Sequence, residues 1–151
     1  IEGLEKKSPD LIIIDRSFNI KKNSNIFKKK NRRIYLFTSS HNKNIENFLK
    51  KKGVKIIKFI QNEDLNLNLK NIFYIIKELG FNRILIESGI TFLNKLLKQN
   101  LIKNFYLFKS SKNLSRAGYN NFSLSFNNVK ISIKNRVKVN LDRDILYKVK
   151  L

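Results

Sequence analysis

The chain has 151 residues, which suffices for one domain with a buried core, and its formal net charge is +21. It contains no cysteine and one histidine, so disulfides, thiolate metal sites and histidine-based metal clusters are excluded and we expect no metal. No apolar run approaches the roughly 20 residues of a membrane span, and no signal-peptide pattern is present. We therefore expect a cytoplasmic protein without a membrane partner.

The positive charge has two interpretations. It could serve a nucleic-acid or anionic-membrane surface. It could also follow from composition, because Lys (25 residues), Asn (22) and Ile (21) dominate while Arg is rare (7), as AT-rich codons would produce. The lysines are scattered and cluster only at residues 28–30 and 50–52, which is typical of solvated positions. We expect no nucleic-acid partner and keep a basic nucleic-acid-binding module as an alternative.

The first half of the chain alternates apolar runs with amphipathic segments. Strands are predicted at residues 11–14, 33–38 and 54–60, and helices at residues 42–52 and 69–79. Gly53 and Gly80 follow these helices, as expected at helix ends. Such alternation predicts a largely parallel sheet with helices on its faces.

Polar residues follow the first two predicted strands. Asp15 and Arg16 come after the first, where Arg16 either binds a phosphate or is an ordinary surface arginine. Thr38, Ser39 and Ser40 come after the second and could contact a cofactor or cap the next helix. His41 precedes that helix, and we assign it no chemistry.

Residues 83–95 carry the most informative pattern. Residues 84–86 form a fully apolar run that predicts a buried strand ending at Glu87, and residues 91–99 have helical apolar spacing. Ser88 and Gly89 join the two. A strand turning directly into a helix presents N–H groups and a positive dipole end to anions. The same pattern also fits an ordinary strand–turn–helix with a solvated glutamate.

The last third of the chain has a different pattern. Residues 105–109 predict a strand, and apolar residues alternate with polar ones in residues 129–134 and 145–151. A turn signal at Asp142, Arg143 and Asp144 lies between the last two. This predicts an antiparallel C-terminal hairpin with one solvated face. The fold class is therefore α/β, with a parallel first part flanked by helices.

The stretch from Ile84 to Lys95 resembles the reductase domain of a known family, the bifunctional riboflavin-biosynthesis deaminase–reductase, which carries a V-E-G-G-P-T-L segment there. The following residues 96–108 resemble that family's helix, "agLvDEl" and strand. Upstream, Gly3-Leu4-Glu5, Ser8-Pro9 and residues 12–16 resemble "pGLe…sP.rivlD". In this chain Ser88 replaces the family's usual Gly or Ala, and Ile90 replaces Pro.

The resemblance implies a dihydrofolate-reductase-like mixed sheet. Residues 1–151 would be a single, partial reductase domain that lacks its first strand and helix. The chain contains no methionine and begins with Ile1, which is expected of a fragment or processed chain. A deaminase domain would then be fused upstream, and the fragment alone would bind weakly and turn over poorly.

The resemblance also implies the chemistry. The family uses NADPH to reduce 5-amino-6-(5-phosphoribosylamino)uracil, a phosphorylated pyrimidine, to its ribitylamino form. Glu87 would bind this substrate. Cofactor-binding positions would be Arg16, Gly89, Ile90, Thr91, Phe92, Leu93, Asn94 and Lys95. No general acid is identified, and a homodimer is expected. The alternative within the same fold is a reductase with a pterin-type substrate.

Overall fold

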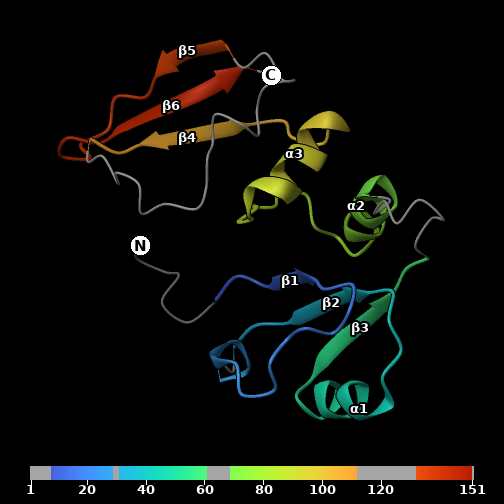
Figure 1. The fold of residues 1–151 in the computed structure, drawn as a ribbon. Helices are drawn as coiled ribbons and strands as arrows, with labels where there is room; N and C mark the ends of the chain where they lie inside the picture. Colours follow the sequence, from blue (N-terminus) through green and yellow to red (C-terminus); the bar gives the residue numbers. More distant parts are fainter. Residues whose placement is uncertain (1–7, 29–30, 61–68, 112–131, 151) are drawn as a thin grey trace. The chain divides into compact units, whose positions relative to one another are not determined.

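The computed structural model describes residues 8–28, 31–60, 69–111 and 132–150. The chain divides into two compact units, Ile1–Ile72 and Phe73–Leu151, and each is described by itself (Figure 1). The quoted motif at Gly3-Leu4-Glu5 lies outside the described residues. That residues 1–151 form one partial domain stays a prediction.

The first unit is built on a parallel three-stranded sheet. Its strands are β1 (Leu11–Ile14), β2 (Ile34–Thr38) and β3 (Val54–Lys58), in the order β1-β2-β3. The register places Ile13 opposite Leu36 and Leu36 opposite Ile56. The predicted parallel arrangement is confirmed. All five residues of β2 are buried, whereas the edge strand β1 is half-buried along its length.

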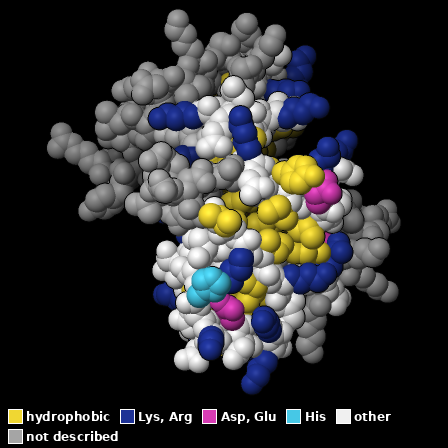
Figure 2. Space-filling view, turned by 90° about the vertical axis from the view of Figure 1, so that its right-hand side faces the viewer, with side chains coloured by type: hydrophobic (Ala, Val, Ile, Leu, Met, Phe, Trp, Pro, Cys, Tyr) yellow, Lys and Arg dark blue, Asp and Glu magenta, His cyan; other side chains and the backbone are white. Residues whose placement is uncertain are grey.

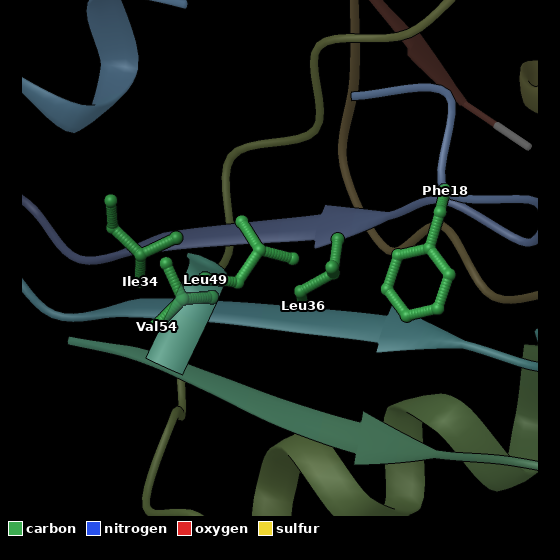
Figure 3. Close-up of a cluster of buried hydrophobic side chains, with 5 residues drawn as sticks. All are labelled: Phe18, Ile34, Leu36, Leu49 and Val54. Atoms are coloured by element: carbon green, nitrogen blue, oxygen red, sulfur yellow. The ribbon is translucent and has the colours of Figure 1, made fainter. Parts of the chain in front are cut away.

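One face of this sheet carries the core of the unit. Buried side chains from three elements and one loop meet there: Phe18, Ile34, Leu36, Leu49 and Val54 (Figure 3). Further apolar residues surround them, contributed by β1, by α1 (Lys43–Lys51) and by the short 3₁₀ helix η1 (Asn25–Phe27). The connector between β1 and β2 therefore covers this face of the sheet through its few apolar residues.

Local sequence explains the limits of α1. The Asn42 side chain accepts a hydrogen bond from the Ile45 amide (3.1 Å), and Glu46 accepts one from the Asn42 amide (3.3 Å). At the other end, Gly53 has φ +75°, a left-handed conformation that glycine adopts without strain. The helix therefore begins and ends within one residue of the predicted limits 42–52. Gly53 then reverses the chain so that β3 can begin at Val54.

The C-terminal sheet is antiparallel and has the order β4-β6-β5. Its strands are β4 (Phe105–Lys109), β5 (Ser132–Arg136) and β6 (Ile145–Lys150). The predicted hairpin is confirmed, with an irregularity between Ile133 and Asn135. Asp142 has φ +57°, and the Asp144 amide donates to the Leu141 carbonyl (3.0 Å), so the turn falls at the predicted residues.

The remaining helices are α2 (Leu69–Glu78) and α3 (Ile90–Lys98), both within a residue or so of their predicted limits. In the described part of the chain, no helix has the length and apolar character needed to cross a membrane.

One predicted strand is wrong. Residues 84–86 belong to neither a strand nor a helix, and Leu85 is 86% exposed. An apolar run indicates a preference for burial, but a strand also needs a neighbouring backbone with which to pair. Within the described residues this segment pairs with no strand. The described strands accordingly form two separate sheets, one parallel and one antiparallel, rather than one mixed sheet.

Candidate functional site

The carboxyl ends of the three parallel strands meet at one edge of the first sheet. In open α/β sheets ligands bind at this edge. Arg16 follows β1 and is exposed, Thr38 ends β2 and is fully buried, and Lys58 ends β3. The edge therefore combines hydroxyl groups with two cations.

The hydroxyl groups after β2 hold the loop after β1. Thr38 Oγ1 donates to the Arg16 carbonyl oxygen (3.1 Å), and Ser39 Oγ donates to the same oxygen (3.3 Å). The helix that follows is capped by Asn42 instead. Capping by residues 38–40, one of the two roles predicted for them, is therefore wrong. Thr38 and Ser39 instead donate hydrogen bonds to the Arg16 carbonyl oxygen.

Phe18 is a member of this edge that the sequence did not indicate. Its φ is +56°, a value that is unusual for a bulky residue, and its side chain is only 6% exposed. Lys58 Nζ lies 4.8 Å from the centre of the Phe18 ring, within cation–π range. In the sequence, Phe18 was distinguished only as an aromatic residue in the mostly polar segment between β1 and β2.

Lys58 is bound into a local polar cluster. Its Nζ donates to the Ser40 carbonyl oxygen and lies 2.6 Å from Glu46 Oε1. The hydrogen bond from Lys58 is the main cause that lowers the pKa of the Glu46 carboxyl, with smaller contributions from the Asn42 amide and the charges of Lys58 and His41. Partial burial acts in the opposite direction. Glu46 is therefore held ionised beside the sheet edge.

This ion pair predicts an acid-sensitive contribution to stability. A carboxyl whose folded pKa lies below its unfolded value stabilises the fold above the unfolded pKa, and the contribution is lost as pH falls through the folded pKa. We expect the free energy of unfolding to decrease between pH 6 and about pH 3, and to decrease less steeply in Glu46→Gln. Urea denaturation at a series of pH values measures both slopes. Equal slopes in the two proteins would contradict a contribution from this pair.

The second set of predicted site residues lies at the start of α3. Gly89 is the N-cap residue, with φ −69° and ψ 163°, and its carbonyl oxygen accepts from the amides of Phe92 (3.2 Å) and Leu93 (3.1 Å). At this described position no side chain caps the helix. The amides of Phe92 and Leu93 are thus paired, whereas the N–H groups of Ile90 and Thr91 precede them and find no partner within the helix. This end of α3 can therefore receive an anion.

Gly89 has neither a conformational nor a packing reason to be glycine. Its φ is ordinary for any residue, and a Cβ built on it meets nothing within 4 Å. Glycine also permits close approach of a ligand to the backbone. The space that a side chain at residue 89 would occupy is therefore not filled by the described residues.

The other predicted cofactor residues lie along the same helix. Thr91 is exposed, and Ile90, Phe92, Leu93, Asn94 and Lys95 are half-buried. Asn94 Oδ1 is buried and has no hydrogen-bond partner within the described part of the chain. Glu87 is exposed and precedes the helix without ending a strand, which corrects the predicted strand-end position. Arg16 belongs to the first unit and residues 87–95 to the second.

The fold is shared with two proteins of known structure. RibD from Acinetobacter baumannii (form 2) superposes with a TM-score of 0.63 at 14% sequence identity, over 91% of this chain and 36% of that one. A pyrimidine reductase-like protein from Corynebacterium diphtheriae gives a TM-score of 0.66 at 15% identity, over 95% of this chain and 62% of that one. The chain thus spans about a third of the length of RibD.

The family model for the RibD C-terminal domain matches residues 2–118. The chain therefore belongs to the RibD C-terminal domain family, which confirms the resemblance carried by residues 84–95 and their flanks. The α/β fold class is confirmed with it. No curated protein matches the chain.

Proposed function

We propose that the chain acts in an NADPH-dependent reductase that converts 5-amino-6-(5-phosphoribosylamino)uracil to 5-amino-6-(5-phosphoribitylamino)uracil. The observation that carries the proposal is Gly89, a glycine that the fold does not require, at the open N-terminus of α3. It falls within the stretch that resembles the family's cofactor segment, and membership of the RibD C-terminal domain family supports the reading.

The residues present suit a phosphorylated dinucleotide. First-turn amides of α3 and the positive end of its dipole attract a pyrophosphate. The buried, unpartnered Asn94 Oδ1 can accept a hydrogen bond from a ligand. Arg16 is exposed at the edge of the first sheet, and its planar guanidinium can bind a phosphate through bidentate hydrogen bonds. Each of these groups is proposed to contact the cofactor, which would supply the hydride when bound.

Glu87 is proposed to bind the substrate. Its carboxylate is exposed two residues before Gly89, and an ionised carboxylate accepts hydrogen bonds from the donors of a pyrimidine or an opened sugar. Such bonds fix the substrate relative to the cofactor, and positioning is the main contribution that a protein makes to hydride transfer. The general acid stays unassigned.

We expect Glu87→Gln to lower kcat/KM by roughly 10- to 100-fold while NADPH affinity stays within about twofold, because one charge-assisted hydrogen bond to substrate is weakened. The experiment uses the full-length protein, follows NADPH consumption by absorbance and measures NADPH affinity by calorimetry. Glu78→Gln, at an exposed glutamate of α2, is the matched control and should leave both quantities unchanged.

Three outcomes would overturn parts of the proposal. Wild-type turnover unaffected by Glu87→Gln would remove the substrate role of Glu87. Turnover of a pterin in place of the phosphoribosylaminouracil would favour the second reductase hypothesis. Absence of NADPH binding by the wild-type protein would remove the reductase assignment altogether.

One surface bears on the proposed homodimer and on the nucleic-acid alternative. Tyr106 and Phe108 are 48% and 66% exposed on β4, and Lys148 of β6 lies opposite Tyr106. We propose that a second copy of the chain covers these aromatic side chains in a homodimer, whereas a nucleic acid would stack bases on them. Figure 2 shows Lys and Arg side chains scattered over one face without forming a continuous band. Retention of RNA that falls log-linearly with salt would favour the nucleic-acid alternative.

A further inference from the structure

Several hydrogen bonds fix the loop that carries Arg16. Asp15 at its start accepts hydrogen bonds through both carboxylate oxygens, from the Ile20 amide (2.8 Å) and the Ser17 amide (3.3 Å). The Asp15 amide itself donates to the Phe37 carbonyl oxygen (2.9 Å), which extends the pairing of β1 with β2. The backbone on either side of Arg16 is therefore tied down.

The Arg16 carbonyl oxygen is held by two side chains that come from the neighbouring strand. Thr38 Oγ1 and Ser39 Oγ both donate to it, at 3.1 Å and 3.3 Å. Thr38 is 0% exposed, so water cannot replace its hydroxyl if that hydroxyl is removed. The same Oγ1 accepts a hydrogen bond from the Ser40 amide (3.3 Å), which orients the hydroxyl.

Phe18 anchors the loop on its other side. Its ring is buried in the core cluster with Leu36 and Leu49, and its backbone is held at φ +56°. A bulky residue persists in this region only when surrounding contacts over-determine it. The burial of the Phe18 ring and the two bonds to the Arg16 carbonyl supply those contacts.

We propose that Thr38 and Ser39 are positioning residues, whose hydroxyl groups hold the Arg16 backbone so that its guanidinium is presented to a phosphate group of NADPH. The inference rests on the proposed NADPH-dependent function. Ordering a long cationic side chain and its loop at the moment of binding costs affinity, and a loop that is already ordered avoids part of that cost. Thr38 acts only through Arg16 and does not itself touch the cofactor.

A double-mutant cycle tests this coupling. In the full-length protein, Thr38→Val keeps the shape of the side chain and removes the hydroxyl, and we expect it to raise the NADPH Kd by roughly five- to tenfold. Thr38→Ser keeps the hydroxyl and should restore affinity to within about twofold. In an Arg16→Gln background, Thr38→Val should have no further effect, because the group through which it acts is absent.

A second measurement reports on the loop without NADPH. Hydrogen exchange of the peptide spanning residues 15–20 should be faster in Thr38→Val than in wild type and in Thr38→Ser. Ile56→Val, which trims the same core from β3, is the control for general loss of stability and should change neither the loop's exchange nor NADPH affinity.

The outcomes separate the inference from the function on which it rests. If wild type does not bind NADPH, the proposed function fails and this role fails with it. If wild type binds NADPH but the effects of Thr38→Val and Arg16→Gln add independently, only the positioning role is overturned. Loop exchange that is unchanged in Thr38→Val would overturn it as well.

Discussion

Gly89→Val should raise the NADPH Kd by roughly 100-fold, about 2.7 kcal/mol, while the protein keeps its fold. The backbone at Gly89 is in an ordinary region, and an added Cβ meets no atom of the described residues within 4 Å. A valine is therefore accommodated by the protein, apart from a modest loss because valine is a poor N-cap. Its two methyl groups would occupy the space through which a pyrophosphate approaches the first turn of α3.

Calorimetry with NADPH and thermal unfolding measure the two effects on the same samples. Gly53→Ala is an instructive comparison, since Gly53 has φ +75° and an alanine there is strained although the surrounding space is open. It should lower the stability of the protein and leave the NADPH affinity of the surviving folded fraction unchanged. Wild-type affinity in Gly89→Val would show that the cofactor does not approach the start of α3.

The elements that the sequence predicts well are those whose signal is local. The spacing of Ile45, Phe48 and Leu49, with Asn42 before them and Gly53 after, locates α1 almost to the residue. Apolar runs likewise locate β1, β2 and β4 within one residue of the structure. Each of these signals depends on residues that are neighbours in the chain, so one sequence contains all the information required.

Residues 84–86 show where such a signal fails. Their apolar character matches that of residues 11–14, and yet the latter pair with β2 while the former pair with no described strand. The difference lies in the partner strand. That strand is remote in the sequence, so the apolar residues of a segment do not reveal whether a partner exists. Pattern alone predicted a strand in both cases.

The candidate site likewise contains residues that the sequence predicts and contacts that it does not. Residues 89–95 are contiguous, so a resemblance to one short family segment is enough to single them out together. Thr38 and Ser39 touch the Arg16 carbonyl across 22 and 23 positions of the chain, and neither the spacing nor the composition of these residues indicates the contact. The sequence did not single out Lys58 either, because it is one of 25 lysines and is distinguished by its contacts to Ser40, Glu46 and Phe18.

Leu36→Ala should lower the free energy of unfolding by about 3 kcal/mol. Leu36 lies in the middle of the central strand β2, is 0% exposed, and contacts the buried cluster formed with Phe18, Leu49 and Val54 (Figure 3). Removing its isobutyl group loses the transfer free energy of the buried carbons and leaves a cavity, because strands on both sides prevent the site from collapsing. Urea denaturation followed by circular dichroism measures the change.

Leu85→Ala is the matched control, since it makes the same chemical change at a leucine that is 86% exposed. A side chain that already contacts water loses little when it is shortened, so we expect a change below about 0.5 kcal/mol. The pair of variants therefore tests the correction to the predicted strand as well as the core. A loss at Leu85 as large as the loss at Leu36 would mean that residues 84–86 are buried in the folded protein, as their apolar character first suggested.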